Sequence, residues 1–283
     1  MLPFILASDV VGTVAVLGTN ASQQFQVGDR VMFSASLAAK STQSGLQEYA
    51  LADVGSTICK VPDALSDDEA ATFPLNLTTV FVAMFIMLGI KAPWQEAGEV
   101  PESLLVVGGG SNCGRFAVQL AKLAGIRTVI TVGGKEEELK ELGATHVLDR
   151  HVDEANIVQR VKEITDDDLP FAIDTVNQSS GLTLGFSALS GKKAGHLARL
   201  LPRGVISDEV RKGHEVTGIV GGGKARDPLS LAMWKRLAGW IERGHIKPTR
   251  YSVAGDLKAE AVNEALDKYR NGRSEGQPHI HVS

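Results

Sequence analysis

An apolar run that passes through a glycine-rich turn directly into a helix is the feature that most restricts how this chain can fold. Residues 104–107 read Leu-Leu-Val-Val, residues 108–114 read Gly-Gly-Gly-Ser-Asn-Cys-Gly, and residues 116–124 read Phe-Ala-Val-Gln-Leu-Ala-Lys-Leu-Ala. Glycines let a backbone approach a diphosphate closely, and a helix N-terminus offers it free N–H groups and a partial positive charge. The pattern therefore predicts a buried strand, a dinucleotide-binding turn and a helix.

Strand-like and helical segments alternate from this point onward. Expected strands cover 104–107, 128–132, 146–148, 171–175 and 195–201, and expected helices cover 115–124, 136–142, 157–164 and about 181–189. Parallel neighbouring strands need a crossover, which a helix supplies, so the alternation predicts an α/β fold with a doubly wound parallel Rossmann sheet. Amphipathic helices over 229–243 and 258–271 and a last strand over 278–282 follow.

The part before this sheet has a different character. Short apolar runs interrupted by glycines over 10–51 predict small strands, one after the turn at 27–31 and one over 46–51, with a surface loop over 34–45 between them. Ser66 and Glu69 have capping-box spacing, which predicts a helix start. A second, buried helix is expected over 75–88.

Coenzyme preference in such folds depends on the residues that follow the next strand. An NAD enzyme usually places Asp or Glu there for the ribose 2′-hydroxyl, whereas an NADP enzyme adds a cation. Here Gly133-Gly134 end the strand, Lys135 follows, and Arg150 is a second candidate cation. This pattern favours NADPH, although Lys135 could instead be solvated and pair with Glu138 on its own helix. No Lys-Ser or Lys-Thr pair follows Gly114, which argues against a nucleoside triphosphate loop.

Composition excludes several other classes of function. The chain has 29 basic and 33 acidic residues, a formal charge of -4 and no long block of one sign, so nucleic acid is not expected as a principal partner. Two cysteines cannot make a disulfide framework, which favours a reducing compartment. The first residues lack a basic signal-peptide region, and the apolar stretch over 80–90 is too short to cross a bilayer. We therefore expect a cytoplasmic protein with no membrane partner.

Several motifs together resemble one protein family. The chain is similar to medium-chain dehydrogenases/reductases of the zinc-independent quinone oxidoreductase and enoyl reductase branch, and it most resembles fungal trans-acting enoyl reductases of polyketide synthesis. The matching stretches run almost end to end, at residues 8–14, 25–31, 45–50, 70–79, 108–114, 142–149, 174–176 and 244–248.

The resemblance implies a division of the chain and a set of coenzyme-binding residues. Residues 1–74 would form a partial GroES-like substrate domain, because relatives have further sequence before the segment that matches Met1. Residues 75–245 would form an inserted Rossmann domain, and residues 246–283 would return to the substrate domain. The turn would bind the diphosphate, Lys135 the 2′-phosphate, and Thr79 would lie beside the nicotinamide. The full set is Gly108, Gly109, Gly110, Ser111, Asn112, Cys113, Gly114, Lys135, Arg150, Thr79 and Val176.

A zinc site is not expected. Zinc-dependent relatives have Gly-His-Glu where this chain has Ala7-Ser8-Asp9, and their four-cysteine loop has no counterpart, because no cysteine precedes Cys59. His279 and His281 form a His-x-His pair with no accompanying carboxylate or thiol cluster visible in the sequence, which predicts structural or solvated histidines.

The resemblance implies NADPH-dependent reduction of an activated C=C bond in a small molecule, an enoyl thioester or enone, or of a quinone. Catalysis would rest on orientation of substrate and coenzyme and on exclusion of water. No proton donor is assigned. Two alternatives stay open, a catalytically degenerate NADPH-binding protein and a module active only with a polyketide synthase partner. The missing zinc ligands argue against an alcohol dehydrogenase. A monomer or homodimer is expected.

Overall fold

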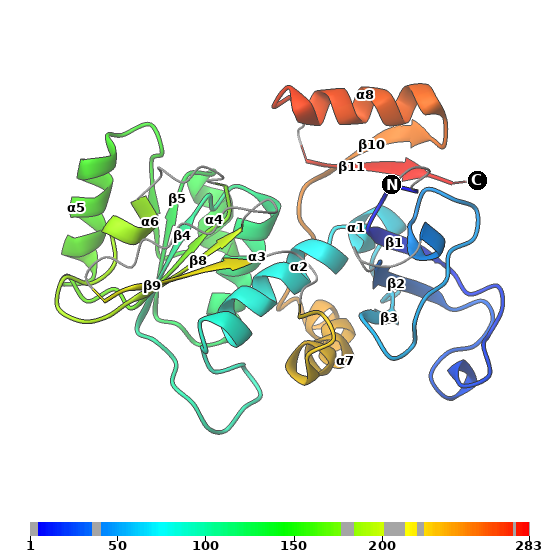
Figure 1. Cartoon of the computed structure of the whole chain (residues 1–283), viewed down its shortest axis with the longest axis horizontal. Coiled ribbons are helices and arrows are strands. Elements are labelled where there is room, and N and C mark those ends of the chain that lie inside the picture. The colour runs from blue at the N-terminus through cyan, green and yellow to red at the C-terminus, as the bar shows by residue number, and fades with distance from the viewer. Residues whose placement is uncertain are drawn as a thin grey trace. The chain divides into compact units, whose positions relative to one another are not determined.

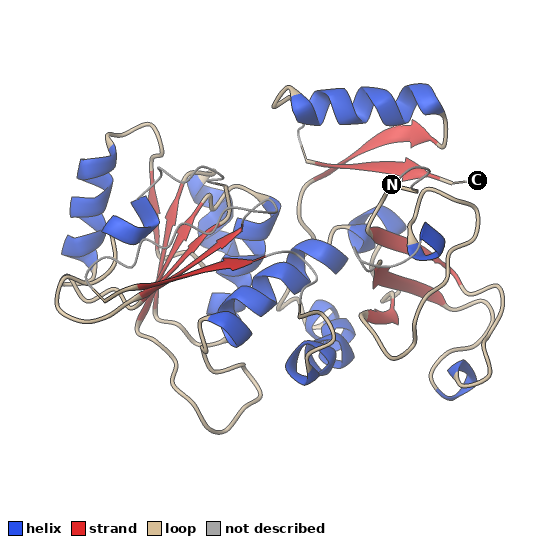
Figure 2. Ribbon diagram, in the orientation of Figure 1, coloured by secondary structure: helices blue, strands red, loops and turns tan. Residues whose placement is uncertain are grey.

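The chain folds into two compact units. The computed structural model describes residues 5–35, 41–176, 184–200, 213–219, 224–273 and 276–282 (Figures 1 and 2). Met1–Thr78 and Lys224–Ser283 form one unit, called here the terminal unit, and Thr79–Gly223 form the other, called the central unit.

The central unit is built on a six-stranded parallel sheet. Its strands are β4 (Ser103–Val107), β5 (Thr128–Val132), β6 (His146–Leu148), β7 (Phe171–Asp174), β8 (His196–Leu200) and β9 (Glu215–Ile219). They lie in the order β6-β5-β4-β7-β8-β9, which confirms the predicted doubly wound α/β sheet. The strand order reverses beside β4, and ligands of open α/β sheets bind outside the carboxyl ends of the strands at such a point.

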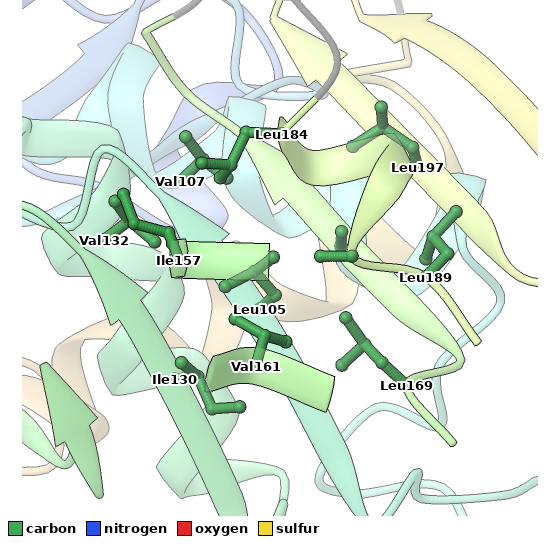
Figure 3. Close-up of a cluster of buried hydrophobic side chains, with 12 residues drawn as sticks. Leu105, Val107, Ile130, Val132, Ile157, Val161, Leu169, Leu184, Leu189 and Leu197 are labelled. Carbon is green, nitrogen blue, oxygen red and sulfur yellow. The ribbon is translucent and has the colours of Figure 1, made fainter. Parts of the chain in front are cut away.

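Helices cover both faces of this sheet. They are α3 (Asn112–Leu123), α4 (Glu136–Leu142), α5 (Glu154–Ile164) and α6 (Leu184–Ser187). All five residues of β4 are buried, as expected for a central parallel strand with helices on both sides. On one face, Leu105 and Val107 of β4 pack with Ile157 and Val161 of α5 in a single apolar cluster (Figure 3).

The terminal unit combines both ends of the chain. Strands β1 (Asp9–Thr13), β2 (Arg30–Ser34) and β3 (Ile58–Lys60) form an antiparallel sheet. Near the C-terminus, β10 (Tyr251–Asp256) and β11 (Gln277–His281) pair in parallel, and α8 (Ala259–Arg270) connects them (Figure 1). Helix α1 (Asp67–Ala71) begins with the predicted capping box, in which the Glu69 N–H donates to Ser66 Oγ at 3.1 Å.

Helix α2 (Pro74–Phe81) continues into a π-helical turn, η3 (Val82–Met87), where the sequence predicts a single buried helix. The helical stretch Asp67–Met87 has the length and apolar composition of a membrane span, with a mean hydropathy of 1.7. However, 72% of its most apolar window is buried inside the structure. Such burial is typical of the core helix of a globular protein.

Three sequence-based expectations differ from the structure. The prediction of a strand over 46–51 is wrong, because residues 44–51 form no strand. The Gly45 N–H donates to Ala7 O and the Leu46 N–H donates to Leu6 O, without a continuous ladder. Strands β9 and β10 were not predicted, since neither alternates apolar and polar residues regularly. The helix expected over about 181–189 is confined to α6 within the described residues, and 181–183 lie outside them.

Helix α7 (Pro228–Glu242) belongs to the terminal unit by its contacts. Its buried Trp234 donates an indole N–H to Thr78 Oγ1 at 3.1 Å. The sequence places this helix within the expected 75–245 domain, whose boundaries remain a prediction.

A partly buried polar network joins the two ends of the chain in the terminal unit. Asp9 of β1 accepts hydrogen bonds from the Leu75 N–H at 2.5 Å and from Gln277 Nε2 of β11 at 3.1 Å. Gln277 also donates to Ala71 O at 3.0 Å and accepts from Asn76 Nδ2 at 2.9 Å. Burial raises the pKa of Asp9 to about 7, against the opposing effect of the two hydrogen-bond donors. The network therefore holds a carboxyl group that resists ionisation.

This raised pKa predicts a pH-dependent stability. The folded state holds the Asp9 proton more tightly than the unfolded chain, so the stabilisation is fully present below the ordinary pKa of 3.8 and is lost as the pH rises through about 7. A shift of about three pKa units corresponds to on the order of 4 kcal/mol. Asp9→Asn keeps the shape of the side chain and should remove this dependence. Urea unfolding of both proteins from about pH 4 to about pH 8 measures it, and parallel stability curves would contradict the assignment.

Candidate functional site

The turn after β4 is closed so tightly that it leaves no room for a Cβ at its glycines. Gly108 has a φ of +86°, and a Cβ there would lie 2.5 Å from Val176 Cγ1 and 2.6 Å from Thr175 Oγ1. A Cβ on Gly114 would overlap the carbonyl oxygen of Gly108. Helix α3 therefore begins directly against the turn, with its first N–H groups beside the carboxyl end of β4.

The turns after β4 and β5 meet backbone to backbone. A Cβ on Gly110 would lie 2.9 Å from the Cα of Gly134, and a Cβ on Gly134, whose φ is +108°, would lie 2.9 Å from the backbone nitrogen of Gly110. We call this contact the glycine edge. The glycine edge lies at the carboxyl ends of two neighbouring strands, β4 and β5. A dinucleotide requires close approach to the backbone at this place in such folds.

Two hydroxyl groups brace the turn from inside. Ser111 caps helix α3, since its Oγ accepts the Gly114 N–H at 2.9 Å. Thr175 Oγ1 lies 2.8 Å from Ser111 Oγ, 2.9 Å from Val107 O and 3.1 Å from Gly108 O. A hydroxyl has one proton, so Thr175 donates to a carbonyl oxygen and Ser111 donates to Thr175. Both protons are used to hold the turn, and any contact of Ser111 with a coenzyme stays a prediction.

The end of β7 contributes a third segment to the same place. Buried Asp174 accepts the Val176 N–H through Oδ1 at 3.1 Å, which directs the chain back toward the turn. Val176 then packs against Gly108. The structure thus brings Val176 to the glycine turn, and its contact with a coenzyme stays a prediction.

Two cations flank the second turn. Lys135 is the exposed N-cap residue of α4, directly after Gly134. The aliphatic part of Arg150 packs over Gly133, where an added Cβ would lie 3.3 Å from Arg150 Cδ. Both predicted 2′-phosphate ligands therefore stand beside the glycine edge. Thr79 lies on helix α2 of the same unit, and its place beside the nicotinamide remains a prediction.

Sequence reasoning missed one residue of this region. Arg115, with a side chain only 4% exposed, donates through Nε to Gly110 O at 3.2 Å and forms an ion pair with Glu138 of α4. Glu138, the carboxylate that the alternative interpretation assigned to Lys135, thus already has a cationic partner. No local pattern joins Arg115 to Glu138, because they meet only through the packing of α3 on α4.

The other candidate side chains lie elsewhere. In the terminal unit, Asp68 Oδ1 lies 3.0 Å from His279 Nδ1 and 3.1 Å from His281 Nε2, so the two histidines share one carboxylate as a hydrogen-bond partner. Among the described residues, no group of three or more His, Cys, Asp or Glu is arranged to hold a metal ion. Burial raises the pKa of the Cys59 thiol to about 12, which keeps it protonated.

Comparison with known proteins identifies the family. The family described as zinc-binding dehydrogenase matches residues 113–199. A trans-enoyl reductase of Alternaria alternata is 30% identical over 292 residues, which cover 96% of this chain and 81% of that protein. The chain belongs to the enoyl reductase branch of the medium-chain dehydrogenases/reductases. This enoyl reductase relative is an oxidoreductase, and members of its family bind a nicotinamide coenzyme.

Two further comparisons agree. The enoyl reductase component of the lovastatin nonaketide synthase of Aspergillus terreus is 29% identical over 205 residues, covering 70% of this chain and 55% of that protein. The crystal structure of the CurK enoyl reductase superposes with a TM-score of 0.77 at 19% identity, covering 98% of this chain and 80% of that one. The latter similarity shows the fold alone.

The bracing hydroxyl of Thr175 gives a stability prediction. Thr175→Val keeps the volume but removes the group that links Ser111 to the carbonyl end of β4, and the buried partners lose a hydrogen bond. We expect the free energy of unfolding to fall by roughly 1–3 kcal/mol. Thr175→Ser, which keeps the hydroxyl, should lose clearly less in the same urea titration. Equal losses in the two variants would show that the hydroxyl does not brace the turn.

Proposed function

We propose that this protein is an NADPH-dependent reductase that reduces an activated C=C bond in an enoyl thioester or enone, without zinc. The observation that carries the proposal is the glycine edge, with Lys135 and Arg150 beside it. A side-chain-free edge admits the backbone of a dinucleotide, and two nearby cations favour a coenzyme with an additional phosphate.

The residues present fit such a coenzyme, since the turn leads directly into the N-terminus of α3 and Lys135 and Arg150 stand beside it. When bound, the nicotinamide supplies the hydride. We assign the diphosphate to the turn over 108–114, the ribose side to Val176, and the place beside the nicotinamide to Thr79. The protein's part is to orient the reactants and exclude water.

Similarity to enoyl reductases supports the substrate class. The relative from Alternaria alternata is named a trans-enoyl reductase, and the Aspergillus terreus relative is named as a component of a polyketide synthase. We therefore propose a small-molecule enoyl substrate and a polyketide synthase as partner. We also propose that residues 1–74 and 246–283 belong to a GroES-like substrate domain and residues 75–245 to a coenzyme domain.

The test is NADPH consumption, followed by near-ultraviolet absorbance, with enoyl thioesters, enones and quinones and with NADH for comparison. Oxidation of NADPH by enoyl thioesters, unchanged by a metal chelator, supports the proposal. Tight NADPH binding without turnover of any substrate points to a degenerate binding protein. Turnover only after addition of a polyketide synthase points to a dependent module. Loss of activity with chelator and recovery with zinc contradicts zinc-free chemistry.

The two cations give a binding prediction. Lys135→Ala or Arg150→Ala should weaken NADPH binding by roughly tenfold, equal to about 1.4 kcal/mol, because a charged contact to the 2′-phosphate is lost. NADH, which lacks this phosphate, should bind unchanged. Fluorescence titration of both coenzymes measures the effect. Lys162→Ala is the control, because Lys162 lies in the last turn of α5, which leads to the opposite end of the sheet, and it pairs with Asp167. Equal effects of all three variants would refute the assignment.

A further inference from the structure

We infer that buried Arg115 sets the coenzyme preference by pairing with Glu138 and so removing a carboxylate charge from the place where a 2′-phosphate binds. This inference rests on the proposed NADPH-dependent function. It assigns a specificity role to two residues that neither belong to the glycine turn nor follow β5 directly.

The position of Arg115 is the first argument. Its Nε donates to the carbonyl oxygen of Gly110 at 3.2 Å, and Gly110 is the residue whose backbone meets Gly134. Its other end forms the ion pair with Glu138, one turn into α4 from Lys135. A single guanidinium group therefore spans from the diphosphate turn to the helix whose N-cap residue is a proposed phosphate ligand.

The charge pattern of α4 is the second argument. The helix starts with three acidic residues, Glu136, Glu137 and Glu138, which suit a helix N-terminus but repel an anion bound there. Glu136 is paired with Lys140 at 2.7 Å on the exposed face. Glu138 is paired with Arg115, so two of the three carboxylates are compensated and Lys135 can attract a phosphate.

Removing this compensation should act on the two coenzymes in opposite directions. A carboxylate near the end of the second strand is the group with which NAD enzymes hold the ribose 2′-hydroxyl. The same carboxylate repels a 2′-phosphate, because the two charges have the same sign. A released Glu138 would therefore disfavour NADPH and tolerate or favour NADH. A purely structural ion pair would instead affect both coenzymes equally.

The burial of Arg115 is the third argument. The residue is 3% exposed, and its Nη2 is buried with no hydrogen-bond partner among the described residues. An unpaired buried guanidinium N–H is costly, and a protein would gain stability from an apolar pair at the same place. A charged guanidinium group at Arg115 is therefore explained better by a role in coenzyme binding than by stabilisation of the fold.

The experiment measures NADPH and NADH dissociation constants by fluorescence titration for four proteins. These are the wild type, Arg115→Gln, Glu138→Gln and the double variant. Arg115→Gln keeps a side-chain hydrogen-bond donor directed toward Gly110 but removes the positive charge. We expect it to weaken NADPH binding at least tenfold while NADH binding changes less than about threefold. Glu138→Gln and the double variant should both keep NADPH binding within about threefold of the wild type. Glu136→Gln is the matched control, because it removes an acidic residue of the same turn that pairs outward.

The possible outcomes separate this inference from the proposed function. A parallel loss of both coenzymes in Arg115→Gln, or a double variant that does not recover NADPH binding, overturns the inference while the proposed function stands. A wild type that binds neither coenzyme overturns both. If Arg115→Gln does not fold, as judged by its thermal unfolding, the apolar pair Arg115→Met with Glu138→Leu takes its place. It should keep the preference for NADPH, because the Glu138 carboxylate is removed together with the charge that compensates it, and loss of the preference refutes the inference.

Discussion

The contact of Gly110 with Gly134 is the constraint on which the rest of the central unit depends. Two turns that follow neighbouring parallel strands can only approach to backbone distance if neither carries a Cβ, and a Cβ on either would come within 2.9 Å of the other chain segment. The approach places the N-terminus of α3 and the N-terminus of α4 at the same edge of the sheet. Polar and charged groups at the starts of α3 and α4 therefore lie close to the glycine edge.

The remaining interactions of the site serve to hold that edge. Thr175 and Ser111 use their hydroxyl protons within the turn, and Asp174 fixes the chain that returns toward Gly108. Arg115 reaches from Gly110 to Glu138. Each of these groups is bonded to main chain or to another side chain of the unit, so the edge is rigid before any coenzyme arrives. Such preorganisation reduces the ordering that binding would otherwise require.

Much of the fold was predictable because the signals are local. The runs of apolar residues in β4 and β5, the glycines between strand and helix, and the capping box at Ser66 each determine a conformation over a few residues. The unpredicted strands β9 and β10 lack such a signal, since their pairing with β8 and β11 forms them rather than their own alternation. The candidate coenzyme residues of the glycine turn, Lys135 and Arg150 rest on the same kind of local signal.

The sequence by itself determined the alternation of strands and helices, the glycine turn and the family resemblance, because these depend on residues close together in the chain. Only the tertiary structure decided which distant groups meet. Arg115 and Glu138 pair because α3 packs on α4, and Asp9 and Gln277 share a partly buried network although 268 positions separate them. Burial and partner choice depend on the packing of whole elements, and no short-range pattern encodes them.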